Sequence, residues 1–406
     1  MESGNFAGRA EYRQSAGPDE GTGAPSSASC QPRPGVIRPG MIRPRVKPEH
    51  AAYRIAGNRV RLGGLSFGIA AEVEDPTGLA WTLLQAMDGS RSIDEIVRLV
   101  AGRHPGETEQ SLRGAIETFV ESGYIEDWGA ADPAELTGRD KERYGRSRAY
   151  FRWLDLTPRT SSWEPQIRLR SARVTVIGLG GTGGNAAAAL AASGVGYLHC
   201  VDRDWVELSN LNRQVLYSEG DIHRPKAEVA TARLRDLNSD IDVTGEQAEI
   251  GSVADIAALA ADCDVLLLCA DRPPEINSWA NRACLATETP WVATGYHGPL
   301  VPVATYVPGN GACYQCLRMT QIENQRRIGA RPDDAAGREE AAGNAVAAPS
   351  AGISGYLAAH AVLSLLTGIP PATPGRIYSV NLVALDEPFV FSGPRRADCP
   401  DCGDQG

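Results

Sequence analysis

The sequence contains no uninterrupted run of 18 apolar residues, the length that a membrane-spanning helix requires. Its first 29 residues also lack the apolar core of a secretory signal peptide. Acidic residues outnumber basic ones by 50 to 40, and the formal net charge of −10 disfavours general binding to nucleic acid. We therefore expect a cytoplasmic protein whose partners include neither a membrane nor nucleic acid.

Histidine is scarce, and none of the six histidines stands at a metal-ligand spacing such as HxxxH. Nine cysteines are present, of which five are scattered along the chain. This distribution disfavours a disulfide framework and favours a reduced compartment. The other four form two CxxC pairs, whose gap of two residues lets two thiolates reach one tetrahedral zinc ion. The paired cysteines are Cys313 with Cys316 and Cys399 with Cys402.

A glycine-rich segment begins near the middle of the chain. The apolar run Val174–Ile177 leads into a cluster of glycines, namely Gly178, Gly180, Gly181 and Gly183. A run of small residues follows, so the order predicts a strand, a tight turn and a helix whose N-terminus binds phosphate. A second predicted strand, Tyr197–Val201, ends at Asp202, where a carboxylate can accept ribose hydroxyls. The segment predicts an α/β fold with a Rossmann-like, doubly wound sheet.

Two cations downstream of Asp202 distinguish between the possible nucleotides. Arg213 and Lys226 lie in a segment that an NAD-dependent oxidoreductase has no need to make basic. Two cations suit a triphosphate better than the pyrophosphate bridge of a dinucleotide. ATP is therefore the predicted nucleotide, and NAD is the less favoured alternative.

Together these motifs resemble the ThiF/MoeB/HesA family, the bacterial relatives of ubiquitin-activating enzymes. That family carries a GxGGxG turn, a D-x-D-x-V-x-x-S-N-L-x-R-Q segment, a later lysine, a strand that ends in Asp, and two CxxC pairs. The corresponding positions here are 178–183, 202–214, Lys226, Asp271 and the four paired cysteines. The resemblance covers residues 140–403, and the order of several independent motifs makes it specific.

The resemblance implies that a carboxylate attacks the α-phosphorus of ATP, which yields an acyl-adenylate and pyrophosphate. Charge accumulates on the phosphates, so the reaction needs cations and a rigid cradle more than an acid or a base. The residues implied are Asp202 for the ribose, Asn210, Arg213 and Lys226 for the phosphates, and Gln214 for support of the loop.

Asp271 is implied as the ligand of Mg²⁺, a hard cation that prefers carboxylate and phosphate oxygens. The family has Asn directly after this aspartate, whereas Arg272 follows it here, which leaves the geometry of the metal open. His297 follows a predicted strand and is a further candidate for the pocket wall.

The positions of the cysteines bear on both structure and mechanism. Two CxxC pairs at family positions imply a structural Zn²⁺, with a redox pair as the alternative for either one. No cysteine lies between Cys316 and Cys399. Family members that pass the activated carboxyl group to their own thiol carry that cysteine within this span. The resemblance therefore implies adenylation without a covalent thioester.

The chain before the glycine turn divides into three parts. Residues 1–47 are rich in Gly, Pro, Ser and Ala and are expected to be a disordered tail. Its basic residues, among them Arg45 and Lys47, are expected to lie in a solvated linker, with contact to an acidic peptide as the alternative. Residues 129–165 are expected to be a linker and lead-in helix before an adenylation domain over 166–403.

Residues 48–128 are expected to form a small α+β domain. The pattern predicts a hairpin over 53–62, a strand over 67–73 and three helices, with Ser92 and Thr108 as N-caps. It resembles the PqqD-like, winged-helix-like domain, which binds the leader peptides of ribosomally made, modified peptides along a sheet edge. A structural winged helix used only for dimerisation is the alternative.

Arg146 lies in a phrase, R-Y-G-R, that resembles one preceding the family's nucleotide domain. The family's second arginine reaches the ATP of a partner subunit, which implies a homodimer, and a surface arginine is the alternative reading. We predict an enzyme that adenylates a carboxylate or carbonyl of a ribosomally made precursor peptide. Adenylation of a sulfur-carrier protein ending in Gly-Gly is the first alternative. The second is a non-catalytic relative that delivers leader peptides to a cyclodehydratase.

Overall fold

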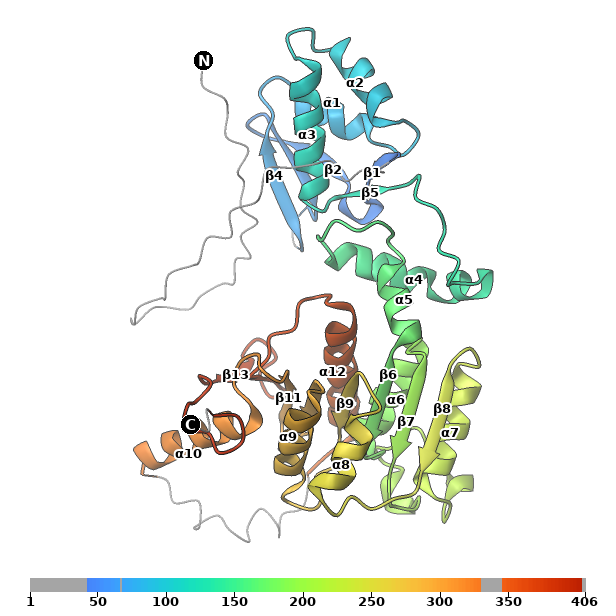
Figure 1. Ribbon diagram of the computed structural model, residues 1–406, viewed down its shortest axis with the longest axis vertical. Coiled ribbons are helices and arrows are strands. Elements are labelled where there is room, and N and C mark those ends of the chain that lie inside the picture. The colour runs from blue at the N-terminus through green and yellow to red at the C-terminus, as the bar shows by residue number, and fades with distance from the viewer. Residues whose placement is uncertain (1–41, 66–67, 330–344, 404–406) are drawn as a thin grey trace. The chain divides into compact units, whose positions relative to one another are not determined.

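The computed structural model describes residues 42–65, 68–329 and 345–403. The chain separates into two compact units, residues 1–164 and 165–406 (Figure 1). The first unit contains the predicted small domain and a long helix. The second contains the glycine turn and both CxxC pairs.

The small domain is built on a three-stranded antiparallel sheet of order β2-β3-β4. Its strands are β2 (Ala52–Ile55), β3 (Arg59–Gly63) and β4 (Ala70–Glu74). The turn between β2 and β3 contains Gly57 and Asn58 at φ values of 78° and 52°, a region that favours these two residue types. The predicted hairpin is therefore confirmed. The third strand begins at Ala70 rather than at the predicted residue 67.

Three helices follow, namely α1 (Leu79–Ala86), α2 (Ile93–Ala101) and α3 (Glu109–Glu121). Ser92 forms a capping box with Glu95, and the Thr108 hydroxyl accepts the Ser111 N–H, which confirms both predicted caps. Leu83, Ile96 and Ile116, one from each helix, are fully buried in a common core that also receives Val73 of β4. The helices and the sheet thus fold as one domain.

Two short strands tie the segment before the small domain to the segment after it. In β1 (Pro44–Val46), Val46 pairs with Ile125 and Pro44 pairs with Asp127 of β5 (Ile125–Asp127). The expectation that residues 1–47 form a disordered tail is therefore wrong for 44–47. Its local composition carries no information about a pairing partner eighty residues away, and pairing overrides composition there. Residues 1–41 lie outside the described residues.

Helix α4 (Gly138–Leu154) belongs to the first unit and not to a bare linker. Thr137 caps its N-terminus through a capping box with Asp140. Near the C-terminus of α4, Arg152 forms ion pairs with Glu49 and Glu126, at 2.5 and 3.3 Å. These contacts attach the predicted lead-in helix to the small domain. Helix α5 (Glu164–Ser171) then leads into the second unit.

The second unit contains an eight-stranded sheet of order β13-β12-β11-β10-β9-β6-β7-β8. Five strands are parallel: β6 (Arg173–Ile177), β7 (Tyr197–Val201), β8 (Asp242–Glu246), β9 (Val265–Leu268) and β10 (Trp291–Thr294). Three antiparallel strands extend one edge: β11 (Leu300–Tyr306), β12 (Arg376–Asn381) and β13 (Phe389–Ser392). The predicted doubly wound α/β fold is confirmed.

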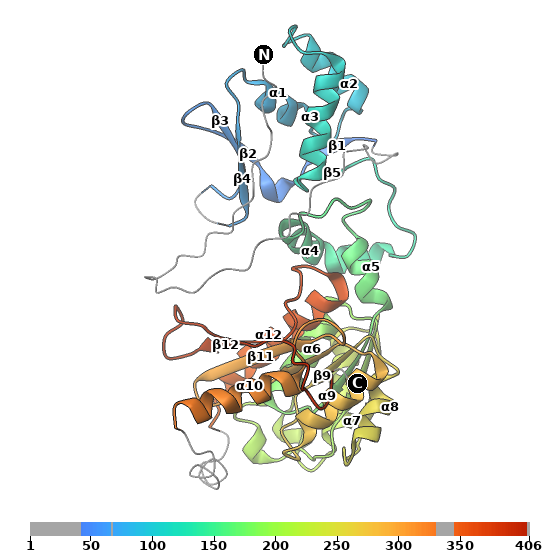
Figure 2. The ribbon, with the colours of Figure 1, turned by 60° about the vertical axis from the view of Figure 1, so that its left-hand side comes forward.

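Helices cover both faces of this sheet (Figures 1 and 2). On one face α6 (Gly181–Ser193) packs against α7 (Lys226–Leu237) and α12 (Ala348–Thr367). On the other face α8 (Val253–Ala260) packs against α9 (Ile276–Thr287), which contacts α10 (Tyr314–Arg327). The strand β9 is buried along its whole length because helices lie on both of its faces.

Helix α12 is, among the described helices, the one with the length and hydropathy of a membrane span. Half of that stretch is buried inside the unit, where α12 packs against α6 and against β9, β10 and β11. This packing accounts for its apolar composition as that of a core helix.

The order of the parallel strands determines where a ligand can bind. The chain runs from β6 outward through β7 to β8, and then returns to place β9 and β10 on the other side of β6. The two connections leave β6 in opposite directions, so a crevice opens beyond the carboxyl ends of β6 and β9. The residues that follow these strands are therefore expected to form a ligand-binding site.

Candidate active site

A cavity of about 400 Å³ lies beyond the carboxyl ends of the parallel strands. Its wall contains the glycine turn after β6, Asp202 after β7, Asp271 after β9 and Tyr296 after β10. The segment after β7 that contains η2 (Leu208–Asn210) and the first residue of α7 form another part of the wall. Nine of the predicted nucleotide and magnesium residues line it: Gly178, Gly180, Gly181, Asp202, Asn210, Arg213, Gln214, Lys226 and Asp271.

The glycine turn brings backbone close to the cavity. Gly178 has φ +91°, and an added Cβ would lie 2.8 Å from the Ala270 nitrogen, so a side chain does not fit there. Helix α6 begins at Gly181 and directs the free N–H groups of its first turn toward the cavity, an arrangement that favours an anion. Gly183 does not line the cavity. An added Cβ there would lie 1.8 Å from the Gly178 carbonyl oxygen, so Gly183 permits the turn to pack on its helix.

Asp202 is held by two backbone N–H groups. Its carboxylate accepts from Leu179 at 2.6 Å and from Asp204 at 2.7 Å. Burial raises the pKa of the Asp202 carboxyl, and the positive charge of Lys226 opposes that rise. The carboxylate is thus fixed in orientation at the end of β7, where a ribose would present its hydroxyls.

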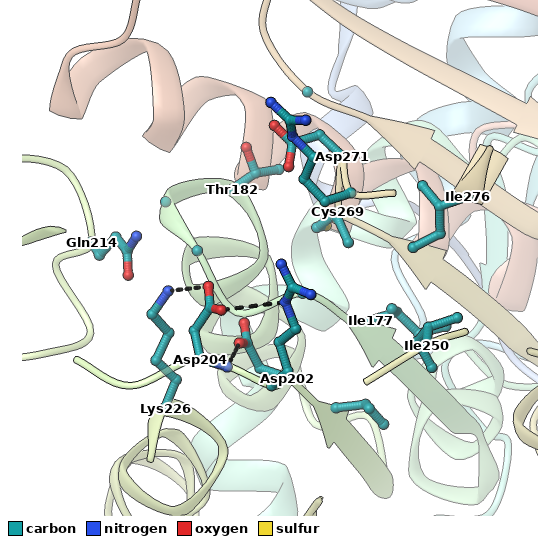
Figure 3. A pocket seen from close by; sticks show the side chains of 18 of the residues that line it. Ile177, Thr182, Asp202, Asp204, Gln214, Lys226, Ile250, Cys269, Asp271 and Ile276 are labelled. Atoms are coloured by element: carbon teal, nitrogen blue, oxygen red, sulfur yellow. Dashed lines mark hydrogen bonds and ion pairs between the residues drawn. The ribbon is translucent and has the colours of Figure 1, made fainter. Parts of the chain in front are cut away.

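Lys226 is the first residue of α7, and its side chain is 5% exposed. Its Nζ lies 3.0 Å from the Asp204 Oδ2, and the Asp204 carboxylate is about half exposed. Asp204 is the second aspartate of the D-x-D segment (Figure 3). The pair keeps a buried ammonium group oriented beside the cavity, with a half-exposed carboxylate as its ionic partner.

Arg213 and Gln214 carry polar atoms that the rest of the described chain leaves without partners. The Arg213 Nη1 donates to the Ser209 carbonyl at 3.0 Å and to the Asn212 Oδ1 at 2.9 Å. The buried Arg213 Nε and Gln214 Oε1 have no hydrogen-bond partner among the described residues. Buried polar groups normally find a partner, so these two atoms indicate a polar ligand in the cavity.

Asn210 anchors the η2 turn (Leu208–Asn210), because its Oδ1 accepts the Glu207 N–H at 3.2 Å. This hydrogen bond between backbone and side chain holds the segment that presents Arg213 and Gln214. The wall therefore suits a triphosphate: a helix N-terminus, a buried lysine and an arginine with unused donor capacity converge on one cavity.

The opposite wall carries Asp271 and Tyr296. Asp271 was predicted from the sequence as the ligand of Mg²⁺, whereas Tyr296 was not predicted. Burial raises the pKa of Tyr296, the adjacent Arg213 opposes that rise, and the Asp271 carboxylate adds to it. Arg213 and Asp271 therefore both lie within electrostatic range of the Tyr296 hydroxyl. The prediction that His297 lines the pocket is wrong, since its neighbour Tyr296 does. An aromatic residue at a strand end was the signal that could have identified it.

Apolar side chains form the remaining part of the wall. In Figure 3, Ile177, Ile250 and Ile276 gather on one side of the cavity, away from Lys226. Val201 and Ala248 also line it. An apolar surface of this kind suits the base of a nucleotide, whereas the opposite end suits its phosphates. These residues were not predicted for the site, although Ile177 and Val201 are the last residues of β6 and β7.

Arg146 lies on α4 of the first unit, where its side chain is exposed. Its predicted contact with the nucleotide of a partner subunit remains a prediction.

The two CxxC pairs meet in the second unit. The Sγ atoms of Cys313, Cys316, Cys399 and Cys402 all lie within 4.8 Å of one another. Cys313 Sγ is 3.7 Å from both Cys316 Sγ and Cys399 Sγ, and the Cys316 and Cys402 sulfurs are 3.4 Å apart. In a tetrahedral site with Zn–S bonds of about 2.3 Å, two sulfurs are separated by roughly 3.8 Å. The donor set and its spacing therefore fit zinc.

Two N–H groups point at these sulfurs from outside the cluster. The Asn281 side-chain amide lies 3.7 Å from Cys313 Sγ, and the Arg396 backbone N–H lies 3.4 Å from Cys316 Sγ. Asn281 also donates to Asp401 at 2.7 Å, within the second CxxC loop. Such donors stabilise thiolates and orient metal ligands. The arrangement joins the end of the chain to α9 and α10.

Comparison with known proteins gives concordant results. A model described as the ThiF family matches residues 155–401. The sulfur carrier protein ThiS adenylyltransferase of Escherichia coli is 36% identical over 243 residues, which are 59% of this chain and 88% of that protein. The molybdopterin-synthase adenylyltransferase of Escherichia coli is 34% identical over 275 residues, which are 66% of this chain and 99% of that protein. The predicted resemblance to adenylyltransferases is confirmed.

Solved structures extend the likeness over more of the chain. The crystal structure of Escherichia coli MccB matches with a TM-score of 0.72, at 21% identity, over 89% of this chain and 97% of that one. MccB with ATP matches with a TM-score of 0.70, at 21% identity, over 89% and 99% of the two chains. At this identity the likeness shows a shared fold. It reaches beyond the part that the family model matches.

Proposed function

The chain belongs to the ThiF family and is an ATP-dependent adenylyltransferase, and we propose that its substrate is a ribosomally made precursor peptide. One observation carries the assignment of the catalytic residues. Lys226, Arg213 and the start of α6 face the same cavity as Asp271, and two buried polar atoms there lack partners among the described residues. That combination suits ATP with a divalent cation.

In the proposed reaction, an oxygen of the substrate carboxylate forms a bond to the α-phosphorus of ATP. The bond from that phosphorus to the bridging oxygen of the β-phosphate breaks, and pyrophosphate leaves with the electron pair. Asp202 accepts the ribose hydroxyls and thereby sets the position of the α-phosphorus. Lys226 and Arg213 offset the negative charge as the anionic carboxylate approaches.

Asp271 is proposed to hold Mg²⁺, and Asn210 and Gln214 to support the loop and contact the nucleotide. The cation would supply positive charge to the phosphates. Asp271 lies on the wall opposite Lys226, so a cation there would leave the phosphates flanked by positive charge on both sides.

The four clustered cysteines are proposed to bind one structural Zn²⁺, with Cys313 and Cys316 from the start of α10 and Cys399 and Cys402 from the end of the chain. The ion would supply folding energy and take no part in the adenylation. No cysteine lies between the two pairs, so the proposed reaction proceeds without an enzyme-bound thioester in that span.

The first unit supports the peptide as substrate. Among the described strands, β4 pairs with β3 alone, so its second edge is open for a strand of peptide to be added. Helix α3 carries a shallow depression lined by Glu109, Gln110, Arg113, Gly114 and Glu117. MccB, which shares the fold, is named a microcin C7 biosynthetic enzyme and was solved with N-formylated MccA. A sulfur-carrier protein is the alternative, because the relatives of higher identity include an enzyme named for such a carrier.

The test measures exchange of radiolabelled pyrophosphate into ATP. Precursor peptides encoded beside the gene should support exchange, and a small protein ending in Gly-Gly should not. The reverse result would replace the peptide with a carrier protein. Failure of ATP to bind in calorimetry would favour the non-catalytic alternative.

A variant in the full-length chain tests the role of α3. An added Cβ at Gly114 meets no atom within 4 Å, so Gly114→Phe can fill the depression without disturbing the fold. We expect it to raise the KM for the peptide about tenfold and to leave ATP affinity unchanged. Gly138→Phe at the start of α4, which is equally open and lies away from Arg146, is the control. An unchanged peptide KM in Gly114→Phe would remove α3 from the binding site.

A further inference from the structure

A single buried hydroxyl connects two walls of the nucleotide cavity. Ser354 lies in α12 and is fully buried. Its Oγ donates to the Gly295 carbonyl oxygen at 2.8 Å and accepts from the Thr182 hydroxyl at 3.2 Å. The Thr294 hydroxyl lies 3.0 Å from the same oxygen. Thr182, Thr294 and Gly295 all line the cavity, whereas Ser354 does not.

The helix that carries Ser354 packs unusually close to the helix that starts at the glycine turn. An added Cβ at Gly355 would lie 2.5 Å from the Thr182 carbonyl oxygen and 2.6 Å from the Asn185 Cβ. One at Gly181 would lie 2.9 Å from the Ala351 Cβ. The stretch of α12 around Gly355 therefore packs directly on the start of α6, and Ser354 lies within that contact.

We propose that Ser354 is a positioning residue that holds the glycine turn and the end of β10 at a set separation. A serine hydroxyl has one donor and two acceptor sites, and the three neighbouring groups can use all of them. One wall carries the glycine turn, which is proposed to bind the phosphates, and the other carries Tyr296 and Asp271. Holding both walls aligns the α-phosphorus with the incoming carboxylate. This inference rests on the adenylation reaction proposed above.

A purely structural role would make Ser354 equivalent to the other buried hydroxyls of α12. Ser364 lies on the same helix, is also buried, and donates to the Pro370 carbonyl oxygen. Neither Ser364 nor Pro370 lines the cavity. Ser364→Ala therefore removes a comparable hydrogen bond from the same helix and serves as the matched control for Ser354→Ala.

The experiment measures hydrogen exchange of the full-length protein with and without saturating ATP and Mg²⁺. In the wild type, ATP should slow exchange both at the glycine turn (178–184) and at the end of β10 (293–297). In Ser354→Ala, we expect the slowing at 178–184 to persist and that at 293–297 to fall by at least about threefold, because the walls are no longer linked. ATP affinity by calorimetry should stay within about threefold of wild type, because the phosphate contacts remain.

Thr182→Val removes the hydrogen bond from Thr182 to Ser354 with little change in side-chain shape. It therefore tests the same connection if Ser354→Ala fails to fold. It should weaken protection at 293–297 as Ser354→Ala does, while Ser364→Ala should match the wild type. The inference is overturned if Ser354→Ala and Thr182→Val keep full protection at 293–297, or if Ser364→Ala loses it equally. Absence of ATP binding to the wild type would instead overturn the adenylation site itself.

Discussion

Buried charged and polar groups gather in two regions of this molecule, and the two regions differ in whether these groups have partners within the fold. In the first unit, Arg152 pairs with Glu49 and Glu126, and Lys47 donates to the Asp155 carbonyl oxygen at 2.5 Å. In the second unit, the cavity retains a buried guanidinium nitrogen and a buried amide oxygen without partners among the described residues.

The difference separates structural from functional charge. The first cluster stabilises the packing of α4 and the β1 segment on the small domain, because each charged group has a partner within the fold. This is also why Arg45 and Lys47, expected in a solvated linker, are largely buried: Arg45 pairs with Glu126 and stacks on Trp128. In the second cluster the atoms without partners belong to residues that line a cavity, where a ligand can bind them, unlike the His50 Nδ1 of the first unit.

The four clustered cysteines form a third group, whose proposed partner is a metal ion. Replacing Cys399 and Cys402 with Ser should reduce the zinc content from one ion per chain to none. It should also lower the free energy of unfolding more than the other variants considered below, since zinc binding contributes directly to folding. Elemental analysis and thermal unfolding measure both effects. Cys263→Ser, outside the cluster, is the control, and zinc-free wild-type protein would contradict the assignment.

Lys226→Ala should have the next largest effect, and that effect should be on catalysis. Removing this ammonium group from the phosphates is expected to lower the rate of pyrophosphate exchange by about 10²–10³-fold. The fold should survive, because the remaining partner, Asp204, is half exposed. Arg233→Ala, an exposed residue of the same helix, should exchange at the wild-type rate. Equal rates in both variants would mean that Lys226 does not act on the phosphates.

Arg152→Ala should show the converse behaviour. It removes the ion-pair partner of Glu49 and leaves Glu126 with Arg45 alone, so the free energy of unfolding should fall by about 3 kcal/mol. Arg91→Ala breaks an exposed pair with Asp88 and should cost less than about 1 kcal/mol. ATP affinity should be unchanged in both variants. Urea unfolding and calorimetry distinguish the effects, and loss of ATP binding in Arg152→Ala would remove the separation between the two clusters.

The smallest expected effect is a difference in pH dependence. Burial lowers the pKa of His50 below its ordinary 6.5, and its Nδ1 has no partner among the described residues. The unfolded chain therefore binds this proton first, and the stability that neutral His50 contributes is lost as pH falls through 6.5 toward the folded-state pKa. His50→Gln should flatten that slope in urea unfolding measured at several pH values.

Asp202 should respond with the opposite sign. Burial raises its pKa, so the folded protein takes up this proton before the unfolded chain does, and stability without ligand rises slightly as pH falls through the raised pKa. ATP affinity should fall over the same interval, because the carboxylate that is proposed to accept the ribose hydroxyls is lost. Calorimetry across acidic pH tests this. An affinity that tracks His50 rather than Asp202 would contradict the division of roles.

Features that depend on neighbouring residues were predictable from the sequence. The glycine turn, the strand ends at Asp202 and Asp271, and the caps at Ser92 and Thr108 follow from local backbone preferences. The meeting of the two CxxC pairs was also predictable, because zinc chemistry requires four ligands and each pair supplies two.

Other features depend on contacts between distant segments. Tyr296 and the apolar wall of the cavity could be assigned only from the strand order, which places β9 and β10 on one side of β6 and β7 and β8 on the other. The strand Pro44–Val46 was missed because its partner lies far along the chain at Ile125–Asp127.

The sequence by itself determined the chemistry available to this protein: a phosphate-binding turn, two cations, two carboxylates and four thiols, each recognisable from residue type and spacing. Only the tertiary structure decided which of these groups converge and what aligns them. Ser354 illustrates the reason. It reaches Thr182 and Gly295 across 172 and 59 positions of sequence, and no local pattern encodes a contact that forms only when two helices pack.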